Sequence, residues 1–169
     1  VFIVLISLIL TLGILFGGHN LYMQYAVQKP VLKELYSSGT VKKAEIEKKN
    51  KKYIIDVQLN DIDNIQKGYE EVESIINGKY KPDSYELVIT GKPNKGLEDL
   101  YEQLQPAVYD ALANNRYLWL NNEIKKQTDE KGMVSKLFID ERRLYIQVKA
   151  DDYYFFKIID RGFEKMNID

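Results

Sequence analysis

The chain of 169 residues contains no cysteine, one histidine and one tryptophan. Without cysteine it cannot form disulfides, bind zinc through thiolates or use a thiol nucleophile. Proline and glycine are few, at four and ten residues. The motifs of P-loop proteins, dinucleotide-binding folds and the nucleophile elbow are also missing. These absences predict a protein that is not an enzyme and that needs no cofactor.

Two other features raise the question of metal binding or catalysis. His19 has only glycine and asparagine beside it, which offer no second metal ligand and no nucleophile to activate. Asp61 and Asp63 lie close together, but the further ligands of an EF-hand are absent, and helix capping explains both acids. We therefore expect no metal site. Carboxylates that the fold brings together stay open as an alternative that would allow hydrolysis.

The charge balance argues against nucleic acid as a partner. The formal net charge is -1, so the chain has no global basic field of the kind that attracts a phosphate backbone.

Residues 1–27 form the longest apolar stretch, with no formal charge before Lys29. A helix needs about 20 apolar residues to cross a bilayer, and this stretch supplies them. A cleaved signal peptide is an alternative, but the apolar run is too long and residues 17–19 are a poor cleavage site. We therefore predict a single transmembrane helix at residues 1–27 that acts as a signal anchor and places the chain in a lipid bilayer.

The orientation of such an anchor depends on which rule dominates. Lys29, Lys33, Lys42 and Lys43 follow the span, and the positive-inside rule would keep the remainder in the cytoplasm. A short span followed by a long domain usually exports that domain. We expect a single-pass protein of the cell membrane whose remaining chain is extracytoplasmic.

The rest of the chain is patterned as an α+β region in two units, which pack separately or as one domain. The first unit, residues 28–93, has the order αββαβ, and the second, residues 94–169, has the order αββα. The expected elements are a helix at 28–37, a hairpin at 41–59, a helix at 61–77, a strand at 85–90, a helix at 94–127 that breaks near Pro106 or Asn114–Asn115, a hairpin at 135–150 and a final helix at 151–166.

Short internal echoes suggest that the two units arose by duplication. Tyr53–Val57 resembles Leu144–Val148 in pattern, and Lys67–Glu70 resembles Arg161–Glu164. The αββαβ order is similar to the ring-building modules of secretion and sporulation channels and to KH-like folds. This resemblance rests on element order alone and implies no functional residue.

The hairpin at 42–52 is the most basic part of the chain, with six lysines and two glutamates. Near a membrane, each lysine could gain about 1 kcal/mol from anionic headgroups. Lysines that guard a strand edge against aggregation are the alternative. The candidate lipid contacts are Lys42, Lys43, Lys48, Lys49, Lys51 and Lys52.

Four consecutive aromatic residues occur at 153–156. On a helix they cannot all face one core, so at least one should be exposed and available to a partner. A helix start buried on both sides is the alternative. The candidate partner surface is Tyr153, Tyr154, Phe155 and Phe156. Together these features predict a membrane-anchored, non-enzymatic interaction or assembly protein with a protein partner or a second copy. The alternative is a module that binds anionic lipid through the lysine hairpin.

Overall fold

The first half of the chain folds into a three-stranded sheet, sheet A, with helices on one face. The computed structural model describes residues 6–7, 11 and 22–162. The β1–β2 hairpin turns at Asn50, which has a φ of 57°, and α3 carries the chain over to β3, which pairs parallel to the central strand β2. The elements are η1 (Met23–Gln28), α2 (Lys29–Ser37), β1 (Val41–Lys49), β2 (Lys52–Leu59), α3 (Ile65–Asn77), η2 (Pro82–Ser84) and β3 (Tyr85–Thr90).

The second half consists of two helices followed by an antiparallel meander, sheet B, with β5 at its centre. The predicted break between the helices is confirmed at Asn115, whose φ of 54° ends α4, whereas Pro106 stays inside α4. The elements are α4 (Lys95–Asn114), α5 (Tyr117–Asp129), β4 (Val134–Ile139), β5 (Arg143–Ala150) and β6 (Tyr153–Asp160).

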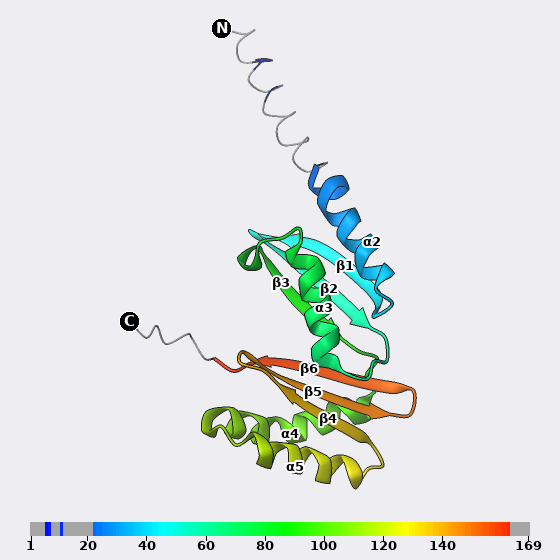
Figure 1. The fold of residues 1–169 in the computed structure, drawn as a ribbon, viewed down its shortest axis with the longest axis vertical. Coiled ribbons are helices and arrows are strands. Elements are labelled where there is room, and N and C mark those ends of the chain that lie inside the picture. The colour runs from blue at the N-terminus through cyan, green and yellow to red at the C-terminus, as the bar shows by residue number, and fades with distance from the viewer. Residues whose placement is uncertain (1–5, 8–10, 12–21, 163–169) are drawn as a thin grey trace, which may run out of the picture.

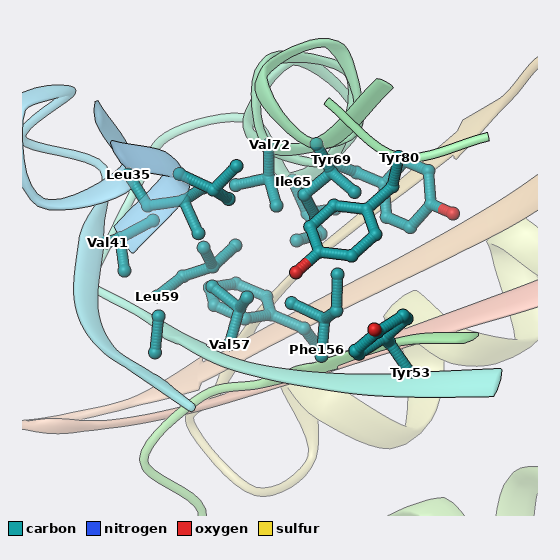
Figure 2. Close-up of a cluster of buried hydrophobic side chains, with 14 of the residues drawn as sticks. Leu35, Val41, Tyr53, Val57, Leu59, Ile65, Tyr69, Val72, Tyr80 and Phe156 are labelled. Atoms are coloured by element: carbon teal, nitrogen blue, oxygen red, sulfur yellow. The ribbon is translucent and has the colours of Figure 1, made fainter. Parts of the chain in front are cut away.

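The two sheets share one hydrophobic core. Figure 1 shows sheet A with α2 and α3 above sheet B, and α4 and α5 below sheet B. Core 1 joins α2, α3 and sheet A to Tyr145, Tyr154 and Phe156 of sheet B. Figure 2 shows Phe156 of β6 among side chains from β2 and α3. Core 2 fills the space between α4, α5 and the opposite face of sheet B. Sheet B is therefore covered on both faces.

The predicted transmembrane helix, and the single-pass membrane localisation based on it, are wrong for the part of the chain that the structure describes. In the described residues 6–7, 11 and 22–162, no helix has both the length and the apolar character needed to cross a bilayer. Most of the predicted span, at 1–5, 8–10 and 12–21, lies outside them. The helices η1 and α2 pack on protein, because their residues Val27, Val31 and Leu35 are buried in core 1.

The predicted element order is wrong at its C-terminal end. Residues 153–160 form strand β6 and not a helix, and residues 163–166 of the predicted helix lie outside the described part. The sequence had suggested Asp151 or Asp152 as the cap of that helix, but Asp151 has a φ of 52° in the tight turn between β5 and β6 and is a turn residue. The side chains of β6 alternate, with Tyr154 and Phe156 in core 1 and Phe155 against core 2.

The class prediction of α+β is confirmed, but the proposed duplication gains no support. The second half has the order ααβββ and not the predicted αββα. Lys67–Glu70 lies on α3, whereas Arg161 and Gly162 follow the strand β6. Arg161 and Gly162, the described residues of the second segment, therefore do not share the helical structure of Lys67–Glu70.

Candidate functional site

Among the described residues, the facing edges of β3 and β6 meet at one end in a single bridge. Lys92 donates its N–H to the carbonyl of Tyr154 at 2.9 Å, and Tyr154 donates its N–H to the carbonyl of Lys92 at 3.0 Å. Gly91 permits this approach, because a Cβ at that position would collide with the carbonyl oxygen of Tyr154. The bridge therefore fixes the antiparallel register of the two edges.

Beyond the bridge the edges bound a groove of about 640 Å³, which we name the β3–β6 groove. Its apolar lining comes from Leu87 and Ile89 of β3 and from Phe156 and Ile158 of β6. These four side chains are only partly exposed or buried, because they also pack on core 1. The remaining lining residues are Tyr69, Glu73, Asn77, Pro82, Tyr85, Glu86, Val88, Arg142, Arg143, Lys157 and Asp160.

The polar wall of the groove centres on an ion pair between α3 and β5. Arg143 donates to both carboxylate oxygens of Glu73, with N–O distances of 2.5 and 3.1 Å, and its guanidinium lies over the ring of Tyr69. Both charged side chains are mostly buried, at 12% and 18% exposed. Burial opposes the charge of Arg143, but the hydrogen bonds from its side chain raise its pKa overall. The guanidinium of Arg143 therefore stays charged, and its two hydrogen bonds to Glu73 fix this wall.

A second carboxylate, that of Asp140, holds the backbone at Arg142 and Arg143 in place. Asp140 accepts hydrogen bonds from the backbone N–H groups of Arg142 and Arg143 and from the hydroxyl of Tyr145 at 2.7 Å. Burial disfavours its charged form, but these hydrogen bonds lower the pKa of Asp140 below its usual range. Burial also raises the pKa of the hydroxyls of Tyr69 and Tyr145, so both are neutral.

Two carboxylates of the groove, those of Glu73 and Asp160, are engaged by arginines. Both oxygens of Glu73 are engaged by Arg143, and Arg142 lies 3.6 Å from one of them. Asp160 contacts the same Arg143 at 3.5 Å. Within the described residues, no group of three or more metal-ligating side chains comes together. The groove thus offers shape, apolar surface and fixed charges, which are the properties of a binding surface.

The acids considered for metal binding instead fasten the start of α3 to sheet B. Asp61 pairs with Lys149, and Lys136 donates to the backbone carbonyl of Asp63 at 2.8 Å. Gln147 is buried beneath them, accepts from the N–H of Ile65 at 3.1 Å and donates to the carbonyl of Ile62. Asn64, and not either aspartate, caps the helix through the N–H of Lys67. His19 lies outside the described residues.

The six candidate lysines are all exposed, but they do not form one uniform basic surface. Lys43 pairs with Glu45 at 2.6 Å and Lys49 with Glu47 at 3.3 Å. Alternation along the regular part of β1 sends Lys48 and Lys49 to opposite faces of sheet A. Their role in lipid binding stays a prediction. Lys42, Lys43, Lys48 and Lys49 lie on β1, Lys51 in the turn and Lys52 at the start of β2.

The four aromatic residues divide between environments. Tyr154 and Phe156 are buried in core 1, Phe155 packs on core 2, and Tyr153 is 40% exposed beside Lys92. Phe156 alone of the four lines the groove. Whether they contact a partner stays a prediction.

The sequence reasoning missed the pairing of Glu73 with Arg143, because 70 residues separate them along the chain. The alternating run at 153–160 was the signal that could have revealed β6 and its open edge. Comparisons with protein-family models, curated proteins and solved structures found no match for this chain.

Proposed function

We propose that this chain is a non-enzymatic interaction or assembly protein that holds a segment of a partner polypeptide in the β3–β6 groove. One observation carries the proposal: two strand edges face each other beside apolar side chains and, among the described residues, pair only at Lys92 and Tyr154. Open strand edges are sites at which proteins commonly bind extended peptides.

The charges of the groove support binding in preference to catalysis. Glu73 and Arg143 neutralise each other, so the wall they form is polar but rigid. The apolar lining is continuous with core 1, which holds it in place. A peptide would therefore meet a preformed surface and would not have to order it first.

A binding experiment with a matched pair of variants tests the proposal. A displayed library of random linear peptides is selected on the full chain, and recovered peptides are measured by fluorescence anisotropy. Val88→Lys places a charge in the groove, whereas Ile54→Lys places one on the same outward face of the sheet, on the central strand β2. Both side chains are partly exposed, so both variants should fold.

We expect Val88→Lys to weaken peptide binding about tenfold or more and Ile54→Lys to change it little. Failure to recover any peptide would contradict the proposal. Equal weakening by both variants would place the binding site elsewhere and would also contradict it.

A further inference from the structure

The backbone of β6 directs the N–H and carbonyl groups of every second residue toward the groove. Tyr154 exchanges both of its backbone hydrogen bonds with Lys92, so its N–H and carbonyl face β3. Arg161 donates its N–H to the carbonyl of Arg142 at 2.8 Å, so residue 161 faces β5. Successive residues of a strand direct these groups to opposite edges. Phe156 and Ile158 therefore share the direction of Tyr154, toward the groove.

The backbone N–H and carbonyl groups of Phe156 and Ile158 lack a strand partner within the described part of the chain. The pairs of β6 all go to β5, and Lys92–Tyr154 is the one bridge to β3. An edge of this kind usually carries lysines or a bulge that prevent pairing with another chain. β1 has both, whereas the β6 run from Phe156 to Ile158 has Lys157 alone, and this lysine lies over the ring of Tyr101 on α4.

We infer that the segment bound in the β3–β6 groove is an extended strand that adds to the open edge of β6. This inference rests on the proposed function and names the class of partner. The added strand pairs its main chain with Phe156 and Ile158. Alternate side chains of the strand lie against the apolar lining, so it carries apolar residues at every second position. Because β3 and β6 run antiparallel, such a strand is parallel to one and antiparallel to the other in either orientation.

The charges at the open end of the groove add a second requirement. Extending the register of Lys92 and Tyr154 places Thr90 opposite Phe156, Val88 opposite Ile158 and Glu86 opposite Asp160. Two carboxylates in opposite positions disfavour direct closure of β3 onto β6. Asp160 already lies 3.5 Å from Arg143, but its side chain is 85% exposed, so with Glu86 it can also complement a basic side chain placed between them. The bound strand therefore carries a lysine or arginine where it passes Glu86 and Asp160.

The test uses peptides recovered by selection on the full chain. Each backbone amide of a recovered peptide is N-methylated in turn, which removes one donor without changing the side chain. A strand that adds to β6 loses about tenfold in affinity at alternate positions and little at the positions between them. Equal tolerance of methylation at all positions would overturn strand addition. The proposed function would still stand if Val88→Lys weakened binding and Ile54→Lys did not.

A charge reversal tests the basic residue. The double variant Glu86→Lys and Asp160→Lys should weaken peptides that carry a lysine or arginine and should select acidic residues from the same library. The matched control, Glu98→Lys with Glu102→Lys, reverses two charges on α4, away from the groove lining. Unchanged peptide composition with the groove variant would overturn the charge requirement.

Discussion

Sheets A and B have the same number of strands but differ in how their surfaces are covered. Sheet B has core 1 on one face and core 2 on the other, whereas the outward face of sheet A carries exposed charged residues such as Glu45 and Asp56. The outer edge of sheet A, β1, carries four lysines and a bulge. The edges that face the groove, β3 and β6, carry few such charges. The comparison indicates that β1 is protected against pairing with another chain and that the two edges at the groove are not.

The largest expected effect comes from breaking the contact between the two sheets. Tyr145 of sheet B is fully buried in core 1 and meets Tyr69 of α3 with ring centroids 5.8 Å apart. Tyr145→Ala should lower the free energy of unfolding by about 3 to 5 kcal/mol, because it leaves a cavity between the sheets. Urea unfolding followed by circular dichroism measures this loss. Tyr109→Ala removes a 62% exposed ring from α4 and should cost less than about 0.5 kcal/mol. Equal losses would contradict a shared core.

A smaller effect is expected from the ion pair that joins α3 to sheet B. Glu73→Ala leaves the guanidinium of Arg143 without its closest carboxylate and should cost about 3 kcal/mol. Glu70→Ala changes an exposed acid on the same helix and is the control. The double variant Glu73→Leu and Arg143→Met should recover most of the stability, because no charge is then left buried. If the double variant had a lower free energy of unfolding than Glu73→Ala, the ion pair would stabilise the fold by more than the neutralisation of two buried charges.

A gain in stability is expected at Tyr80, which lies in core 1 beside sheet A. Its hydroxyl is buried and has no hydrogen-bond partner among the described residues. Tyr80→Phe should therefore stabilise the protein by about 1 kcal/mol at neutral pH. Tyr154→Phe removes a hydroxyl that donates to the carbonyl of Leu59 at 3.1 Å and should destabilise it. If both variants were more stable than the wild type, the proposed difference between an unpaired hydroxyl at Tyr80 and a hydrogen-bonded one at Tyr154 would be contradicted.

The same residue predicts an alkaline limit to stability. Burial raises the pKa of Tyr80 to about 12. A raised pKa means that the folded state favours the protonated phenol of Tyr80. The contribution of this protonation to the free energy of unfolding is complete below about pH 10 and is lost as the pH rises toward 12. The advantage of Tyr80→Phe over the wild type should grow across this interval. Thermal unfolding at several pH values measures it, and a constant difference would contradict the assignment.

The smallest effect on stability is expected at the guarded edge. Replacing Lys48, Lys49, Lys51 and Lys52 by Gln should change the free energy of unfolding by less than about 0.5 kcal/mol, because all four are exposed. Light scattering should show faster aggregation if these lysines protect β1. Sedimentation with anionic vesicles at low salt tests the lipid hypothesis, and equal binding by variant and wild type would contradict it.

Sequence patterns predicted the elements whose signals are local. The alternation at Tyr53, Ile55 and Val57 predicted β2, and the helical spacing of Ile65, Tyr69 and Val72 predicted α3. The run at 153–160 was misassigned because two acids before it resembled a helix cap, although its alternation is that of a strand. Aspartate is favoured both in tight turns and at helix N-caps, so its presence alone does not distinguish the two structures.

The candidate site could not be predicted from the sequence, because its parts are distant in the chain. Glu73 and Arg143 meet only when α3 packs on sheet B, and the edges of β3 and β6 meet at the Lys92–Tyr154 bridge, which Gly91 permits. No spacing rule connects these residues.

By itself the sequence determined the α+β class, the absence of thiol chemistry and the hairpin at 41–59, because each depends on composition or on neighbouring residues. The tertiary structure alone decided that two small sheets share core 1, that Asp61 and Asp63 bind lysines of sheet B and that two strand edges stay open toward each other. The physical reason is that burial and charge pairing join residues through space, and periodicity along the chain records only which face each residue occupies.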